Sequence, residues 1–92
     1  MKKYHFELSE RKNKKYKVWH DIAGWIHFGH PYYEHYKTSN EIPKELHVWP
    51  EHRDLKRRRL YRARASKIRD KNGNLTYLDE TSPNYWSYWF LW

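Results

Sequence analysis

The fold is decided by one stretch of the sequence, Tyr16-Lys17-Val18-Trp19-His20-Asp21-Ile22-Ala23-Gly24-Trp25-Ile26-His27-Phe28. Tyr16 and Val18 are spaced two residues apart, a period that is typical of a β-strand. Residues 21–24 form a turn, in which Gly24 is free to adopt a positive φ angle. Residues 25–28 follow as a second strand, so the stretch predicts an antiparallel hairpin.

A third strand precedes this hairpin. Tyr4, Phe6 and Leu8 are also spaced two residues apart, which predicts a strand over residues 4–8. The polar, basic residues 9–15 then connect the first two strands as a turn. The three strands together predict an antiparallel meander.

A long basic helix is predicted for residues 51–70. Glu51 and Asp54 lie in its first turns, where acidic side chains suit the helix dipole. Asn72-Gly73 follows as a stop signal. A single narrow apolar stripe runs along the helix and consists of Tyr61, Ala65 and Ile68.

The C-terminal segment is aromatic and predicts a short helix. Ser82 is suited to the N-cap and Pro83 to the first helical position. Residues 85–92 are apolar on nearly every side, so they must be buried in the domain or against a partner. We favour burial in the domain. The alternative is an anchor for a partner protein, made of Tyr85, Trp86, Trp89 and Trp92.

These elements predict a single α+β domain over residues 1–92: an antiparallel hairpin or three-stranded meander, one long basic helix and a short aromatic helix. The length of 92 residues suits one domain. Aromatic residues make up 20% of the chain and can build its core. For the connecting segments we expect a helical turn at residues 32–36, a loop at residues 38–47 and a short strand at residues 75–78.

The charge balance indicates a polyanionic partner. The chain has 19 Lys and Arg residues against 11 Asp and Glu residues, a net charge of +8. Arginine suits phosphate because its planar guanidinium donates two parallel hydrogen bonds. We therefore predict a non-enzymatic protein that binds the phosphate backbone of DNA or RNA with weak sequence specificity. The predicted contact residues are Arg57, Arg58, Arg59, Arg62, Arg64 and Lys67 on the helix, with Arg11, Lys12, Lys14 and Lys15 on the turn.

Other chemistries find little support in the residues. The chain has no cysteine, which excludes disulfides and thiolate zinc sites. Its three glycines are isolated, so they form no phosphate-binding loop. It has no run of about 20 apolar residues that would span a membrane. No apolar run follows the N-terminal lysines, so secretion is not expected. We expect no cofactor.

Seven histidines leave a metal site as a less favoured alternative. Neutral imidazole binds zinc and nickel. A metal-dependent nuclease would use His27, Glu34 and His52 as its hypothetical members. These residues match no local catalytic motif, so the prediction is of no metal and no catalysis.

Several short motifs occur in a set order along the chain: Glu10-Arg11-Lys12-Asn13-Lys14-Lys15-Tyr16, Ile26-His27-Phe28-Gly29, the Tyr33 and Tyr36 pair, His52-Arg53-Asp54 with Arg59, Tyr61 and Arg64, and Tyr85-Trp86-Ser87-Tyr88-Trp89-Phe90-Leu91-Trp92. In this order they resemble a family of small basic uncharacterised proteins of nucleocytoplasmic large DNA viruses, the giant viruses. The resemblance implies a viral source and a location in the virion or in the host cytoplasm or nucleus. It supplies no site residues. The alternative to nucleic-acid binding is a virion structural or assembly protein whose basic side binds an acidic protein surface.

Overall fold

The structure, a computed structural model, describes residues 4–92 and contains the predicted meander. Its three antiparallel strands lie side by side in chain order. They are β1 (Phe6–Leu8), β2 (Tyr16–His20) and β3 (Gly24–Phe28). The hairpin is therefore confirmed over the expected residues, while the first strand begins at Phe6 rather than at Tyr4.

One face of this sheet carries the core. The register places Val18 opposite both Phe6 and Ile26, so side chains two apart on each strand point to the same side. The buried cluster joins these residues to the C-terminal helix, and its members are Phe6, Tyr16, Val18, Ile26, Phe28, Ile42, Trp86, Phe90 and Leu91. The expected aromatic core is thus present.

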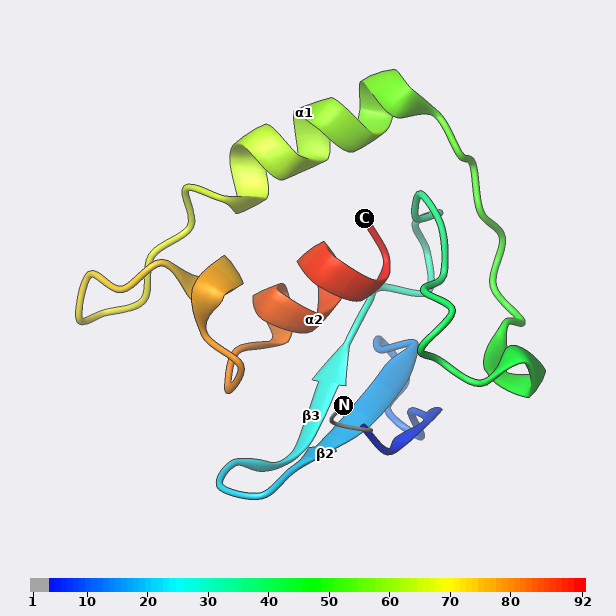
Figure 1. Cartoon of the computed structure of the whole chain (residues 1–92), viewed down its shortest axis with the longest axis horizontal. Coiled ribbons are helices and arrows are strands. Elements are labelled where there is room, and N and C mark those ends of the chain that lie inside the picture. The colour runs from blue at the N-terminus through cyan, green and yellow to red at the C-terminus, as the bar shows by residue number, and fades with distance from the viewer. Residues whose placement is uncertain (1–3) are drawn as a thin grey trace.

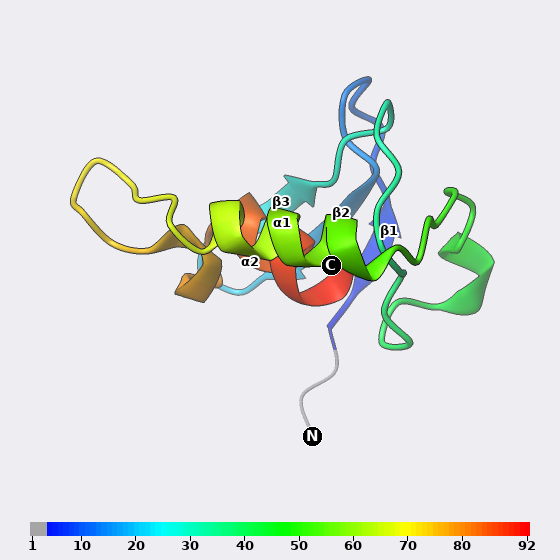
Figure 2. The same ribbon diagram turned by 90° about the horizontal axis from the view of Figure 1, so that it is seen from above.

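The C-terminal helix α2 (Pro83–Phe90) forms as predicted and covers the sheet. The Ser82 hydroxyl caps it by accepting a hydrogen bond from the Asn84 N–H. Trp86 lies fully buried between the helix and the strands. The second helix, α1 (Leu55–Ala65), lies over α2 on the side away from the sheet (Figures 1 and 2). The α+β architecture is therefore a sheet and two helical layers.

The basic helix is shorter than the predicted range of residues 51–70. Glu51 does not enter it, because its carboxylate accepts a hydrogen bond from the Thr38 N–H at 2.7 Å. Arg53 has a φ of 53°, which interrupts any helix at that point. Asp54 is the N-cap, and its carboxylate accepts hydrogen bonds from the N–H groups of Lys56 and Arg57.

The helix also ends early, at Ser66. The Ile68 carbonyl accepts hydrogen bonds from both the N–H and the hydroxyl of Thr76, which pulls the chain out of helical geometry. Ile68 is consequently exposed, and the predicted apolar stripe stops at Ala65.

Two connecting segments also differ from expectation. The strand predicted at residues 75–78 is the 3-10 helix η2 (Thr76–Leu78). The helical turn predicted at residues 32–36 is irregular, because His35 forms a β-bridge with Glu51. The loop at residues 38–47 contains the 3-10 helix η1 (Lys44–Leu46).

Candidate nucleic-acid interface

Helix α1 docks on the rest of the domain along a narrow seam. Tyr61 stacks on Trp92, with ring centroids 4.1 Å apart and an interplanar angle of 8°. Ala65 is buried, and its carbonyl accepts a hydrogen bond from the Asn84 side chain at 3.0 Å. The rest of the helix circumference is largely exposed.

Two of the predicted phosphate contacts belong to this seam. Arg58 and Arg62 donate hydrogen bonds from Nε to the main-chain oxygen of Trp92, at 2.8 and 3.2 Å. The Arg62 guanidinium also lies 4.6 Å from the ring centroid of Tyr88. Like charges at this i, i+4 spacing repel in an isolated helix, and here they share one acceptor. Both side chains are half-buried, so they attach α1 to the domain.

The other helical cations face solvent. Six of the eleven residues of α1 are Lys or Arg, and none is acidic. Among residues 4–92, the carboxylate that pairs with an α1 cation is Glu34, 3.7 Å from Arg57. The exposed cations of α1 and the residues just after it, which we call the outer face, are Lys56, Arg57, Arg59, Arg64 and Lys67.

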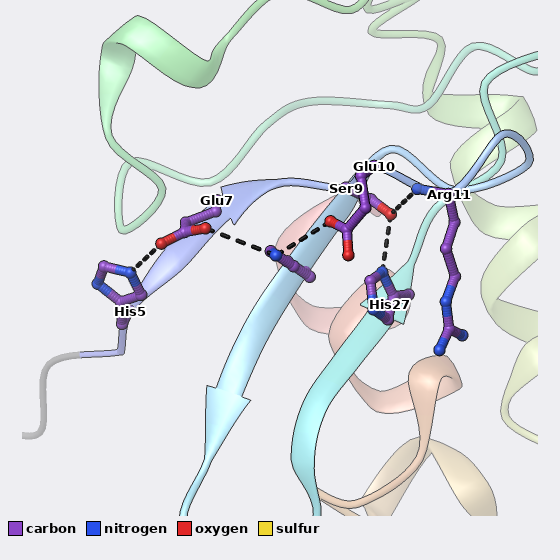
Figure 3. Close-up of polar contacts among 7 residues, drawn as sticks. His5, Glu7, Ser9, Glu10, Arg11 and His27 are labelled. Carbon is purple, nitrogen blue, oxygen red and sulfur yellow. Dashed lines mark hydrogen bonds and ion pairs between the residues drawn. The ribbon is translucent and has the colours of Figure 1, made fainter.

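The basic turn between β1 and β2 is ordered by Ser9. Its hydroxyl accepts a hydrogen bond from the Arg11 N–H at 3.0 Å and lies 2.7 Å from Nδ1 of His27 (Figure 3). The side chain of Arg11 extends away from this contact, and Lys12 is also exposed. The turn therefore presents cations to solvent next to β3.

The acidic groups beside this turn are already paired. Lys17 lies 3.0 Å from Glu10 and 3.6 Å from Glu7. Glu7 also contacts His5 at 2.6 Å (Figure 3). The hydrogen bond from His5 is the largest influence lowering the Glu7 pKa, and the hydrogen bond from Lys17 is the largest for Glu10. These carboxylates consequently stay ionised and neutralise Lys17 rather than Arg11 or Lys12.

Lys15 differs from the rest of the turn because it is only 2% exposed. Its Nζ donates hydrogen bonds to the Tyr33 carbonyl at 2.6 Å and to His35 Nδ1 at 2.8 Å. With Nδ1 accepting, His35 carries its proton on Nε2 and donates to the Thr38 hydroxyl at 2.7 Å. Burial lowers the pKa of Lys15 to about 8 and that of His35 to about 4.

A cavity of about 470 Å³ joins the two basic segments. It lies between α1, the loop at residues 29–35 and the C-terminal end of α2. Its walls include Lys14 and Lys15 from the turn and Arg57 and Arg64 from the helix. The structure thus brings four of the ten predicted contact residues around one space. Arg59 and Lys67 face solvent elsewhere on the outer face, and Arg11 and Lys12 lie on the exposed turn.

The residues of the alternative metal site are not brought together. His27 is engaged by Ser9, and Glu34 pairs with Arg57. His52 Nδ1 accepts a hydrogen bond from the Asp54 N–H at 2.9 Å. Over residues 4–92, no group of three His, Asp or Glu side chains is arranged to hold a metal ion.

The predicted partner anchor is divided between core and surface. Trp86 is fully buried, and Trp92 stacks on Tyr61. Tyr85 is half-buried and packs against the core, whereas Trp89 is exposed. The aromatic segment is therefore mainly core, as favoured from the sequence.

Sequence reasoning missed two features of this site. Gly29 lies at the cavity with a φ of 79°, and a Cβ there would lie 3.1 Å from side-chain carbons of both Lys15 and Leu91. The role of Trp92 in holding two arginines was also not foreseen. The close packing at Gly29 had a signal in the sequence, because an isolated glycine directly after a strand marks a close approach of the backbone.

The fold and the site define a small α+β domain with an exposed basic helix and a cation-lined cavity. Comparison with protein-family models, with characterised proteins and with solved structures returns no match. None of the helices described in residues 4–92 is long and apolar enough to cross a membrane.

Proposed function

We propose that this chain is a non-enzymatic nucleic-acid-binding protein that contacts phosphates through the outer face of α1 and the exposed basic turn. The observation that carries the proposal is the imbalance of charge on α1. Its exposed cations face solvent, and within residues 4–92 one carboxylate, that of Glu34, pairs with them. Such a surface releases condensed counterions when it binds a polyanion, which drives sequence-independent association.

The attachment of α1 strengthens this interpretation. Because Arg58 and Arg62 are held by the Trp92 oxygen, the helix is fixed to the domain without using its outward cations. A helix held in this way presents its charges at set spacings, so its backbone need not be ordered on binding. The proposed contacts are therefore the outer face, with Arg11, Lys12 and Lys14 from the turn.

The test compares two triple variants of equal charge in binding labelled random-sequence duplex DNA over a salt series. The first replaces outer-face residues and is Lys56→Gln, Arg59→Gln and Lys67→Gln. The second replaces exposed lysines outside the outer face and the turn, and is Lys37→Gln, Lys44→Gln and Lys71→Gln. Each lost phosphate contact reduces the slope of log affinity against log salt by about 0.9. We expect a reduction of roughly 3 for the first variant and little change for the second.

Two results would refute the proposal. Absence of binding by the unaltered protein at low salt would remove nucleic acid as the partner. Equal losses in the two triple variants would show that only net charge matters. Circular dichroism of both variants checks that the helices remain folded.

A further inference from the structure

The cavity beside α1 contains a buried cation that lacks a carboxylate partner. Lys15 forms no ion pair within the described part of the chain, and its two hydrogen bonds go to neutral acceptors. An ammonium has three N–H groups. The third takes part in no hydrogen bond among the described residues, and Nζ lies 5.7 Å from the ring centroid of Trp49. Burying a charge is costly unless an opposite charge compensates it. The site therefore favours an anionic occupant.

The remaining charges at the cavity agree with this. Lys14 and Arg64 line it together with Lys15 and Arg57, whereas the acidic residue in its wall is Glu34. Glu34 is directed to Arg57, at 3.7 Å. One carboxylate side chain among four cationic side chains leaves the lining predominantly cationic.

The cavity is too large and too apolar to be shaped for a phosphate ion alone. Its volume of about 470 Å³ lies in the range of small-molecule sites. Leu60, Leu91 and the stacked pair of Tyr61 and Trp92 form apolar parts of its wall. Tyr33 lies at the same cavity and is 69% exposed, which leaves ring surface free for stacking. Cations beside exposed aromatic rings suit an unpaired base with its phosphate.

We infer that this cavity receives one unpaired nucleotide of a nucleic-acid strand, with the phosphate at Lys14, Lys15 and Arg64 and the base against Tyr33 and Leu60. The inference rests on the proposed function and adds a substrate class to it. The outer face binds any phosphate backbone, while the cavity distinguishes strands with unpaired bases from continuous duplex.

The experiment measures affinity for a labelled single-stranded 12-nucleotide oligomer and for a duplex of the same length. Two pairs of matched variants separate the cavity from the surface. Tyr33→Ala removes a ring at the cavity, and Tyr32→Ala removes a neighbouring ring that is 75% exposed and outside it. Leu60→Glu places a negative charge at the cavity, and Leu55→Glu places the same charge elsewhere on α1. Leu60 is 59% and Leu55 67% exposed, so neither change disturbs the core.

We expect Tyr33→Ala to weaken single-strand binding by roughly fivefold or more, the effect of losing one stacked base. Leu60→Glu should also weaken it, because the introduced carboxylate repels the phosphate. Tyr32→Ala and Leu55→Glu should weaken it far less. Duplex binding should change by the same small factor within each pair.

Equal weakening within both pairs, or equal effects on single strand and duplex, would overturn the inference. A third result would also overturn it: the protein binds adenosine 5′-monophosphate but binds the single-stranded oligomer no more tightly than the duplex. The ligand of the cavity would then be a free nucleotide. If the protein binds duplex DNA but the cavity variants bind single strands as their matched controls do, the proposed function stands and only this inference is refuted. If the protein binds neither the single strand nor the duplex, both the proposed function and this inference are refuted.

Discussion

Raising the pH from 7 to 9.5 should stabilise the fold by about 2 kcal/mol through Lys15 alone. Burial lowers the pKa of Lys15 from 10.5 to about 8. Between these two values the unfolded chain binds a proton that the folded chain does not, so the free energy of unfolding rises with pH. The rise begins near pH 8 and amounts to about 1.36 kcal/mol per pH unit, which gives about 2 kcal/mol by pH 9.5.

The assay is urea unfolding followed by tryptophan fluorescence at several pH values between 7 and 9.5. The range stops there because burial raises the pKa of Tyr16 to about 12. The unfolded chain loses that proton near pH 10, so Tyr16 opposes the effect of Lys15 at higher pH. Lys15→Met supplies the reference, because it retains a long apolar side chain and cannot titrate.

The difference between the two proteins isolates Lys15 from the general fall in net charge. We expect the free energy of unfolding to increase more with pH in the unaltered protein than in Lys15→Met, by about 2 kcal/mol. Identical pH dependence in the two proteins would refute the reasoning, since Lys15 would then titrate alike in the folded and unfolded chains.

Three further predictions concern the elements around the site. Gly29→Ala should destabilise the fold more than Gly73→Ala. Both residues have a positive φ, which costs an alanine about 1–2 kcal/mol, but only a Cβ at Gly29 also meets packed side chains. Thermal unfolding of the two variants measures the difference. Arg62→Ala should lower the free energy of unfolding by roughly 1–2 kcal/mol, because it removes a hydrogen bond and a ring contact. Arg59→Ala should change that free energy by no more than about 0.5 kcal/mol. Equal effects of the two changes would contradict the role of Arg62 in attaching α1 to the domain. Asp54→Ala removes the N-cap of α1 and should cost about 1 kcal/mol, visible as reduced helicity together with a lower denaturation midpoint.

The parts of the fold that could be predicted from the sequence are those set by neighbouring residues. The hairpin between Tyr16 and Phe28 follows from a local two-residue period and a glycine turn. The start of α2 follows from Ser82 and Pro83, because capping involves only the next few residues. The limits of α1 could not be found in this way, since Glu51 is held by Thr38 from a distant loop.

The site shows the same division. The exposed cations of α1 could be read from composition, but the burial of Lys15 could not. Its N–H points to the carbonyls of both Phe28 and Gly29, so the chain leaves the regular strand geometry at that residue. The strand alternation that places Lys17 on the outer side therefore does not extend to Lys15. Nothing local distinguishes it from Lys14.

The resemblance to giant-virus proteins stays a prediction, as does location in a virion. The alternative of a virion assembly protein is separated from nucleic-acid binding by the salt series. An acidic protein partner would leave the affinity for DNA low even at low salt.

The narrow attachment of α1 has a consequence for local opening. A helix with six cations in eleven residues has little stability of its own, because short helices form poorly in water and like charges repel. Its persistence depends on a few contacts: the stacking of Tyr61 on Trp92, the two arginines that meet at the Trp92 oxygen, and buried Ala65 with its hydrogen bond from Asn84. When these contacts separate, the whole helix is released together. We therefore expect the amide protons of α1 to exchange sooner than those of the sheet and α2, and to become protected if a bound polyanion neutralises the helix.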